Sequence, residues 1–98
     1  MQFLVKAYDG QDAGEKRRQA RPRHLAGMKE LGERVICAGG LTDGEGNVKG
    51  SALVLGFASR AELDEYLRGE PYVTEGVWER IEVEPMNVVI VNGRKVGQ

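Results

Sequence analysis

The order of strand-like and helical segments restricts the fold of this chain more than any other feature of its sequence. Stretches rich in β-branched and aromatic residues alternate with stretches of helical period. The predicted segments run strand, helix, strand, strand, helix, strand, over residues 2–8, 15–32, 34–41, 48–57, 59–69 and 77–85. This order predicts a ferredoxin-like α+β fold, in which two helices cover one face of an antiparallel sheet.

Local residue patterns refine the two helices. Ser59 and Glu62 form a predicted capping box at the start of the second helix, and Gly69 is expected to end it. Pro22 falls inside the first helical pattern, where it removes an amide donor. We therefore expect either a kinked helix or a fresh helical start at Pro22.

The last strand shows a regular alternation. Its pattern predicts that Val77, Ile81 and Val83 share one face of the sheet. Trp78 is expected on the opposite face. Residues 70–76 are expected to form a plain connection that leads into this strand.

Apolar residues occur on both faces of the third predicted strand. Leu53, Leu55 and Phe57 share one face, while Ala52 and Val54 lie on the other. Helices cover only one face of such a sheet, and a face that meets water should be polar. We therefore expect a homodimer that packs sheet to sheet.

Length and composition indicate one small domain. The 98 residues are expected to form a single domain over residues 1–91, followed by a flexible tail over 92–98. Charged residues make up 30% of the chain but nearly cancel to a formal net charge of −1, which disfavours nucleic acid and anionic membranes as partners. The sequence shows neither a signal pattern nor a membrane-spanning apolar run, so a cytoplasmic protein is expected.

One cysteine and one histidine limit the available chemistry. An internal disulfide is excluded, and so are thiolate and multi-histidine metal sites built from one chain. Cys37 lies mid-strand among apolar neighbours, where an inert buried thiol is expected. The glycine patterns typical of nucleotide sites and nucleophile elbows do not occur, and no cofactor or metal is predicted.

His24 is the first candidate for chemistry. At helical spacing it shares a side with Arg17, Arg21, Met28 and Leu31, on or beside the core-facing stripe. Histidine is the side chain that most readily takes and returns protons near neutral pH. A lone histidine on such a stripe is also typical of core packing, so spacing alone leaves both interpretations open.

Glu70 is the second candidate. It directly follows the helix-ending Gly69, and Pro71 fixes the backbone after it. A carboxylate held in this way can orient an imidazole that acts as a base. An ordinary exposed loop acid is the alternative interpretation.

Glycines near the predicted hairpin form a third group of candidates. Gly39 and Gly40 lie close to a strand end, where glycine lets a ligand or another backbone approach closely. The same glycines also suit a simple hairpin turn. The residues predicted to contact a small-molecule ligand are Arg17, Arg21, Gly39, Gly40, Ser51 and Tyr72, with Arg17 or Arg21 holding an anionic group.

Several motifs, taken in order, resemble the YCII-related (YciI-like) family. The opening QFLVKAYD leads to Glu15-Lys16-Arg17-Arg18 and then to Arg21-Pro22-Arg23-His24-Leu25. Ala38-Gly39-Gly40 resembles the family's AGP segment, and Glu70-Pro71-Tyr72-Val73 with Gly76-Val77-Trp78 resembles its DPYV…GVY run. The resemblance covers residues 1–86.

The resemblance implies a dimeric α+β barrel and a cleft in which a histidine and an acid act together. The family histidine corresponds to His24, and the acid of the DP dipeptide corresponds to Glu70, whose stem is longer than that of aspartate by one methylene. Gly40 replaces the usual proline of AGP, which loosens the adjoining loop.

The resemblance implies a cofactor-independent acid–base enzyme of isomerase, lyase or dehydrochlorinase type. The resemblance implies a small polar aromatic or lactone-like substrate, because a family relative is a dehydrochlorinase of a chlorinated hydroxyquinol. A non-catalytic ligand-binding or accessory dimerisation domain is the alternative. A third interpretation, nucleic-acid binding through the basic cluster at residues 16–23, competes with a simple solvated helix end.

Overall fold

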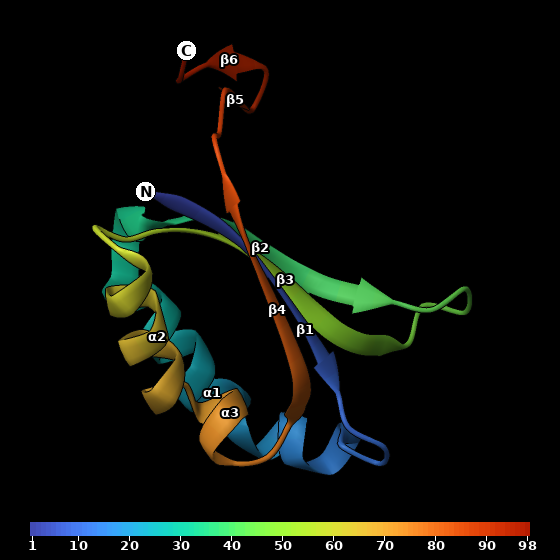
Figure 1. Cartoon of the computed structure of the whole chain (residues 1–98). Helices are drawn as coiled ribbons and strands as arrows, with labels where there is room; N and C mark the ends of the chain where they lie inside the picture. Colours follow the sequence, from blue (N-terminus) through green and yellow to red (C-terminus); the bar gives the residue numbers. More distant parts are fainter.

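The computed structural model describes all 98 residues and shows helices packed on one face of an antiparallel sheet (Figure 1). The strands are β1 (Gln2–Asp9), β2 (Val35–Thr42), β3 (Val48–Gly56) and β4 (Trp78–Met86), in the spatial order β2-β3-β1-β4. The helical layer contains α1 (Gly14–Leu31), the 3-10 turn η1 (Gly32–Arg34), α2 (Arg60–Gly69) and the short α3 (Pro71–Thr74). This arrangement confirms the predicted ferredoxin-like α+β fold.

The core lies between the sheet and the helices, and β1 is at its centre. Phe3, Val5 and Ala7 are buried on the helix side of β1, whereas the residues between them are half-exposed on the other side. Val5 is in register with Leu53 of β3 and with Val83 of β4. Side chains directly opposite each other share a face, so one apolar layer continues across three strands.

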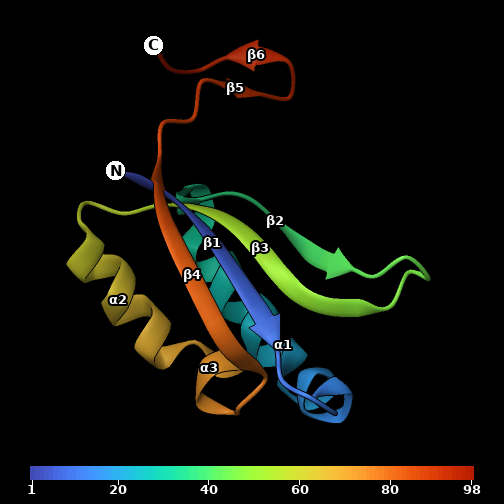
Figure 2. The same ribbon diagram turned by 45° about the vertical axis from the view of Figure 1, so that its right-hand side comes forward.

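α1 is continuous through Pro22, which matches the kinked-helix alternative. Figure 2 shows the first turns of α1, in blue, set at an angle to its later, teal turns. The helix ends at Gly32, whose φ of 58° belongs to the left-handed region that favours glycine. None of the helices is long and apolar enough to cross a membrane.

The start of α2 confirms the predicted capping box. Ser59 Oγ accepts a hydrogen bond from the Glu62 amide at 3.2 Å, and Glu62 Oε2 accepts one from the Ala58 amide at 3.0 Å. Ser59 therefore satisfies one amide that a helix start would leave unpaired, and Glu62 reaches back to the residue before the cap.

The segment predicted as a plain connection contains α3 instead. The Glu70 carboxylate accepts a hydrogen bond from the Tyr72 amide at 3.2 Å, and Pro71 occupies the first helical position. Both features favour a helix start. The prediction was wrong because Glu70, interpreted as a residue after a helix end, also begins the next helix.

The predicted faces of β4 need one correction. Val77 and Trp78 are both buried, with exposed fractions of 0% and 6%, although they were expected on opposite faces. The register between β1 and β4 shifts at Tyr8 and Asp9, which leaves Trp78 opposite Asp9. Such an irregularity re-aims side chains, and it turns the indole toward the helices.

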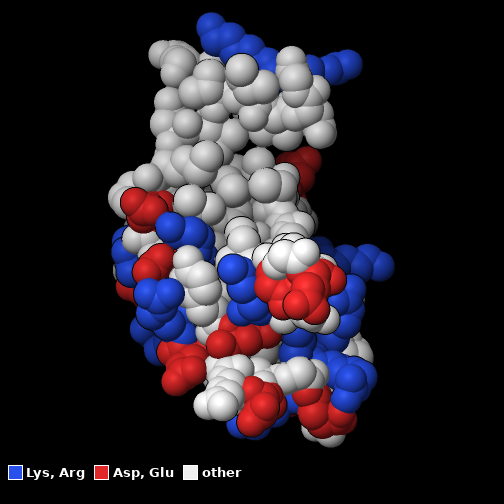
Figure 3. Space-filling view, turned by 90° about the vertical axis from the view of Figure 1, so that its right-hand side faces the viewer, with Lys and Arg blue, Asp and Glu red and all other residues white.

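The sheet face away from the helices is only partly covered. Leu4, Ala52 and Val54 are half-buried on this open face. Cys37, predicted to be a buried thiol, is exposed beside Val54, because β2 is an edge strand whose register shifts just before this residue. Figure 3 shows charged side chains over the lower half of the molecule, a mostly uncharged surface above them, and basic side chains again at the very top. A partner's sheet on the open face stays a prediction.

The C-terminal residues form a separate hairpin that extends away from the main sheet (Figure 1). β5 (Ile90–Val91) pairs with β6 (Arg94–Lys95). Val88, just before the hairpin, is buried, and its amide donates to Gln2 Oε1 at 2.8 Å. Residues 92–98 thus include one strand, and their flexibility stays a prediction.

At Gly50, β3 leaves no room for a side chain beside β1. A Cβ atom built at Gly50 would lie 2.3 Å from the carbonyl oxygen of Ala7. Gly50→Ala should therefore lower the free energy of unfolding by about 1–3 kcal/mol, as overpacking does. Gly39→Ala on β2 is the matched control, because a Cβ atom there meets nothing within 4 Å. Urea unfolding of both variants tests this, and equal losses of stability would contradict it.

Candidate functional site

His24 and Glu70 meet inside the helical layer, which is the contact that the family resemblance implied. His24 Nδ1 lies 2.6 Å from Glu70 Oε1, and the exposed fractions of the two residues are 8% and 1%. α1 supplies the histidine, and the start of α3 supplies the carboxylate. The tautomer that donates from Nδ1 to this carboxylate leaves Nε2 as a proton acceptor.

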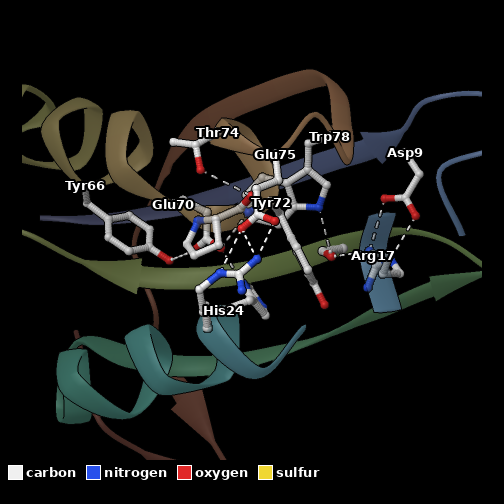
Figure 4. Close-up of polar contacts among 12 residues, drawn as sticks. Asp9, Arg17, His24, Tyr66, Glu70, Tyr72, Thr74, Glu75 and Trp78 are labelled. Atoms are coloured by element: carbon white, nitrogen blue, oxygen red, sulfur yellow. Dashed lines mark hydrogen bonds and ion pairs between the residues drawn. The ribbon is translucent and has the colours of Figure 1, made fainter. Parts of the chain in front are cut away.

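Three hydrogen bonds hold the Glu70 carboxylate in place (Figure 4). Besides His24, the Tyr72 amide donates to Oε1 at 3.2 Å, and the Tyr66 hydroxyl donates to Oε2. A buried carboxylate is tolerated only where its oxygens are paired in this way. Glu70 therefore orients His24, caps α3 and anchors Tyr66 at once.

Aromatic rings fix the plane of the His24 imidazole. The Tyr72 ring stacks on it, with centroids 3.9 Å apart and an interplanar angle of 12°. Trp78 meets the imidazole edge-on at 5.9 Å and 79°. Stacked and edge-to-face contacts both favour one ring orientation.

A second polar network lies on the other side of Tyr72 (Figure 4). Arg17 binds Asp9 through two hydrogen bonds of 2.8 and 3.1 Å. Arg17 Nη2 also donates to Ser51 Oγ at 2.9 Å, and Trp78 Nε1 donates to the same oxygen at 3.3 Å. The guanidinium carbon of Arg17 lies 4.7 Å from the centre of the Tyr72 ring, so this network supports the stacked rings.

The predicted ligand contacts line one cavity of about 310 Å³. His24 forms part of its wall, together with Arg17, Arg21, Gly39, Gly40, Ser51 and Tyr72. The rest of the wall is apolar and comprises Leu25, Met28, Val35, Ala38, Val48 and Leu53. Glu70 lies behind His24 and does not line the cavity. This volume is at the small end of ligand sites, which range over about 300–1,000 Å³.

The two arginines predicted to hold an anion differ in the structure. Arg17 is bound to Asp9 and Ser51, and only 14% of its side chain is exposed. Arg21 lines the cavity and is exposed, and it makes no ion pair or hydrogen bond with another side chain. Arg21 is therefore the cation that is available to a ligand.

Three side chains of the site were not predicted for the contacts they make. Tyr66 was assigned no role, although its spacing of four residues from Glu70 is the signal for a contact across one helical turn. Asp9, which binds Arg17, was assigned no role either. Trp78 was expected on the sheet face opposite Val77, but it donates to Ser51 from behind the cavity.

Tyr66 and Tyr72 make the free energy of unfolding depend on pH. Burial, reinforced by the hydrogen bond to Glu70, raises the pKa of Tyr66 far above its ordinary value, and burial also raises the pKa of Tyr72. Above about pH 10 the unfolded chain loses these two protons while the folded chain keeps them. The unfolded state then binds fewer protons, so stability falls as pH rises. Urea unfolding across this range should show a shallower fall for Tyr66→Phe, and an unchanged slope would contradict the assignment.

Comparison with known proteins identifies the family of this chain. The sequence model of the YCII-related domain matches residues 1–87. Protein YciI of Escherichia coli O6:H1 is 31% identical over 97 residues, which cover 91% of this chain and 99% of that protein. Protein YciI of Shigella flexneri matches to the same extent.

Solved structures share the fold. The 5-chloro-2-hydroxyhydroquinone dehydrochlorinase of Burkholderia phenoliruptrix AC1100, in complex with 2,5-dihydroxybenzoquinone, superposes with a TM-score of 0.83. It is 21% identical, and the match covers 88% of this chain and 93% of that one. Protein Atu4242 of Agrobacterium tumefaciens has a TM-score of 0.50 at 12% identity, over 94% of this chain and 98% of its own. At these identities, the likeness establishes the fold.

Proposed function

This chain belongs to the YCII-related family, and from that premise we propose that it is a cofactor-independent acid–base enzyme acting on a small polar ring compound. One observation carries the proposal. His24 lines a small cavity, and its Nδ1 is held by a buried carboxylate at 2.6 Å. The tautomer that donates from Nδ1 to Glu70 has Nε2 as a proton acceptor, which is what a general base requires.

The proposed reaction begins when Nε2 of His24 takes a proton from the bound compound. The imidazolium that forms lies against the Glu70 carboxylate, whose opposite charge favours it. His24 then returns the proton to another atom of the same molecule, which gives an isomerisation, or to a leaving group, which gives an elimination. Because His24 is buried and stacked, it is placed for transfer without reorganisation.

The cavity supports a small, planar, anionic or hydroxylated ligand. Its volume fits a single ring with a few substituents, and its wall joins apolar side chains to the unpaired Arg21. The dehydrochlorinase with the same fold acts on 5-chloro-2-hydroxyhydroquinone and binds 2,5-dihydroxybenzoquinone. A compound of this size and polarity is therefore our first choice of substrate class.

The partner that we propose is a second copy of this chain, packed through the open face in the cytoplasm. Half-buried Leu4, Ala52 and Val54 on that face would be covered by the same residues of the other protomer. Val54→Lys should convert a dimer to a monomer in analytical ultracentrifugation, whereas the surface control Arg60→Lys should not. A monomeric wild-type protein would contradict this proposal.

The alternative function is a non-catalytic ligand-binding or accessory dimerisation domain, which the apolar open face also favours. Proton exchange in deuterium oxide distinguishes the two. Wild-type protein is incubated with hydroxylated quinones, chlorinated phenols and lactones, and proton NMR follows deuterium uptake and product formation. Exchange or conversion that is lost in His24→Gln supports the enzyme. Binding of these compounds with neither exchange nor conversion would favour the accessory domain.

A further inference from the structure

The hydroxyl of Tyr66, on α2, reaches the carboxylate that holds His24. It donates a hydrogen bond to Oε2 of Glu70, whereas Oε1 of the same carboxylate lies 2.6 Å from His24 Nδ1 (Figure 4). The Glu70 side chain has no exposed surface, so these partners and the Tyr72 amide replace water around it. One buried carboxylate therefore connects the imidazole to a phenol on another helix.

Tyr66 lies outside the ligand cavity. It lines a second cleft, of about 360 Å³, whose wall shares no residue with that cavity. Its ring is held by stacking on Phe57, with centroids 5.7 Å apart and an interplanar angle of 28°. A ligand in the cavity does not contact Tyr66, so any effect of Tyr66 on the chemistry passes through Glu70.

We propose that Tyr66 is a positioning residue, which limits the basicity of His24 by sharing the negative charge of Glu70. This inference rests on the proposed function and deepens it, because it assigns control of the base to a residue outside the cavity. A hydrogen bond to one oxygen of a carboxylate draws negative charge from the other oxygen. Glu70 Oε1 then attracts the imidazolium form of His24 less strongly, so His24 remains a neutral base down to a lower pH.

The Tyr66 hydroxyl stays a donor throughout the pH range in which histidines titrate. Burial, reinforced by the hydrogen bond to Glu70, raises the pKa of Tyr66 far above its ordinary value. The phenol therefore keeps its hydrogen near neutral pH, and the charge that it draws from Glu70 does not change there.

Apart from His24, no ionised side chain makes a hydrogen bond with Glu70 or Tyr66. The titratable side chains around His24 are Asp9 on β1, Arg17 and Arg21 on α1, and Tyr72 on α3. Those around Tyr66 are Glu30 on α1, Arg34 on η1, and Glu62 and Glu65 on α2. Tyr66→Phe changes none of these charges and keeps the ring beside Phe57, so it removes only the hydrogen bond to Glu70.

NMR of the free protein tests the proposal without a substrate. In Tyr66→Phe the charge of Glu70 concentrates on Oε1, which strengthens the hydrogen bond from His24 Nδ1. The ¹H resonance of the hydrogen on Nδ1, observed with ¹⁵N-labelled histidine, should therefore move downfield from its wild-type position. Tyr8→Phe, on the open face of the sheet, is the matched control and should leave this resonance unchanged. An unchanged resonance in a folded Tyr66→Phe protein would overturn the proposal, and so would the absence of a hydrogen on Nδ1.

The pH dependence of kcat/KM gives a second measurement. The rate falls at low pH as His24 becomes protonated, and a more basic His24 is protonated at a higher pH. The low-pH limb of Tyr66→Phe should lie about 0.5–1 pH unit above that of wild type, because His24 feels part of a hydrogen bond worth roughly tenfold or more. A purely structural role would instead lower kcat/KM at every pH without moving the limb, and that result would also overturn the proposal.

The two measurements separate this proposal from the proposed function. A downfield Nδ1 resonance in Tyr66→Phe, with no turnover of any compound by wild type, would keep the control of His24 by Tyr66 and remove the acid–base function. Turnover with a low-pH limb that Tyr66→Phe does not move would keep the function and remove the role of Tyr66.

Discussion

Replacing His24 by alanine should reduce turnover of a substrate by about 10²–10⁴-fold, the usual contribution of a general acid–base group. The reason is the position of its imidazole. Nδ1 is bound to Glu70 at 2.6 Å, and the ring forms part of the cavity wall, so no other side chain of the wall can replace Nε2 as a base near neutral pH. Turnover is measured by absorbance at saturating and limiting substrate, together with a circular dichroism spectrum of each variant.

Two controls make this result specific to proton transfer. Arg23→Ala changes the neighbouring residue on the exposed side of α1, where Arg23 pairs with Glu75, and should retain turnover. Added imidazole should restore part of the activity of His24→Ala, because a small base can enter the space left by the side chain. Full turnover by a folded His24→Ala protein would rule out His24 as the base.

Replacing Glu70 by alanine should lower the free energy of unfolding by about 3 kcal/mol or more, because each buried donor left without its acceptor costs about 1–3 kcal/mol. Glu70 is 1% exposed and accepts hydrogen bonds from His24, Tyr66 and the Tyr72 amide. Its loss leaves all three donors unpaired and removes the cap of α3. Urea unfolding with linear extrapolation measures the change.

Glu75→Ala is the matched control for Glu70→Ala, because it removes a glutamate only five residues away that makes a more exposed ion pair with Arg23. Exposed pairs contribute about 0–1 kcal/mol, so this variant should remain close to wild type in stability. Glu70→Gln keeps the size of the side chain and should fold, with a lower turnover because an amide orients the imidazole less well. A Glu70→Ala protein as stable as Glu75→Ala would mean that the carboxylate is not the acceptor at the centre of this network.

The fold followed from sequence periodicity because its elements obey local rules. Phe3, Val5 and Ala7 alternate as a half-buried strand must, and Ser59 with Glu62 begins α2 as a capping box does. The predictions for the burial of Trp78 and Cys37 were wrong for one reason. Each lies next to a register shift, and a bulge depends on how two distant strands pair.

The site followed from the sequence only in part. Helical spacing placed Arg17, Arg21 and His24 on one side of α1, and all three line the cavity. The contact between His24 and Glu70 spans 46 residues and was suggested by family resemblance, since no local pattern predicts it. The free hydroxyl of Tyr72 was beyond sequence reasoning, because a missing hydrogen bond is visible only when every neighbour is in place.

Nitrogen NMR of the single histidine is the most direct test of the proposed chemistry. With ¹⁵N-labelled histidine, the neutral imidazole of the free protein should carry its hydrogen on Nδ1, the atom bound to Glu70. Addition of 2,5-dihydroxybenzoquinone should shift the Nε2 resonance strongly and leave the Nδ1 hydrogen in place. A hydrogen on Nε2 in the free protein, or an Nε2 resonance that no hydroxylated ring compound changes, would contradict the role of His24 as the base.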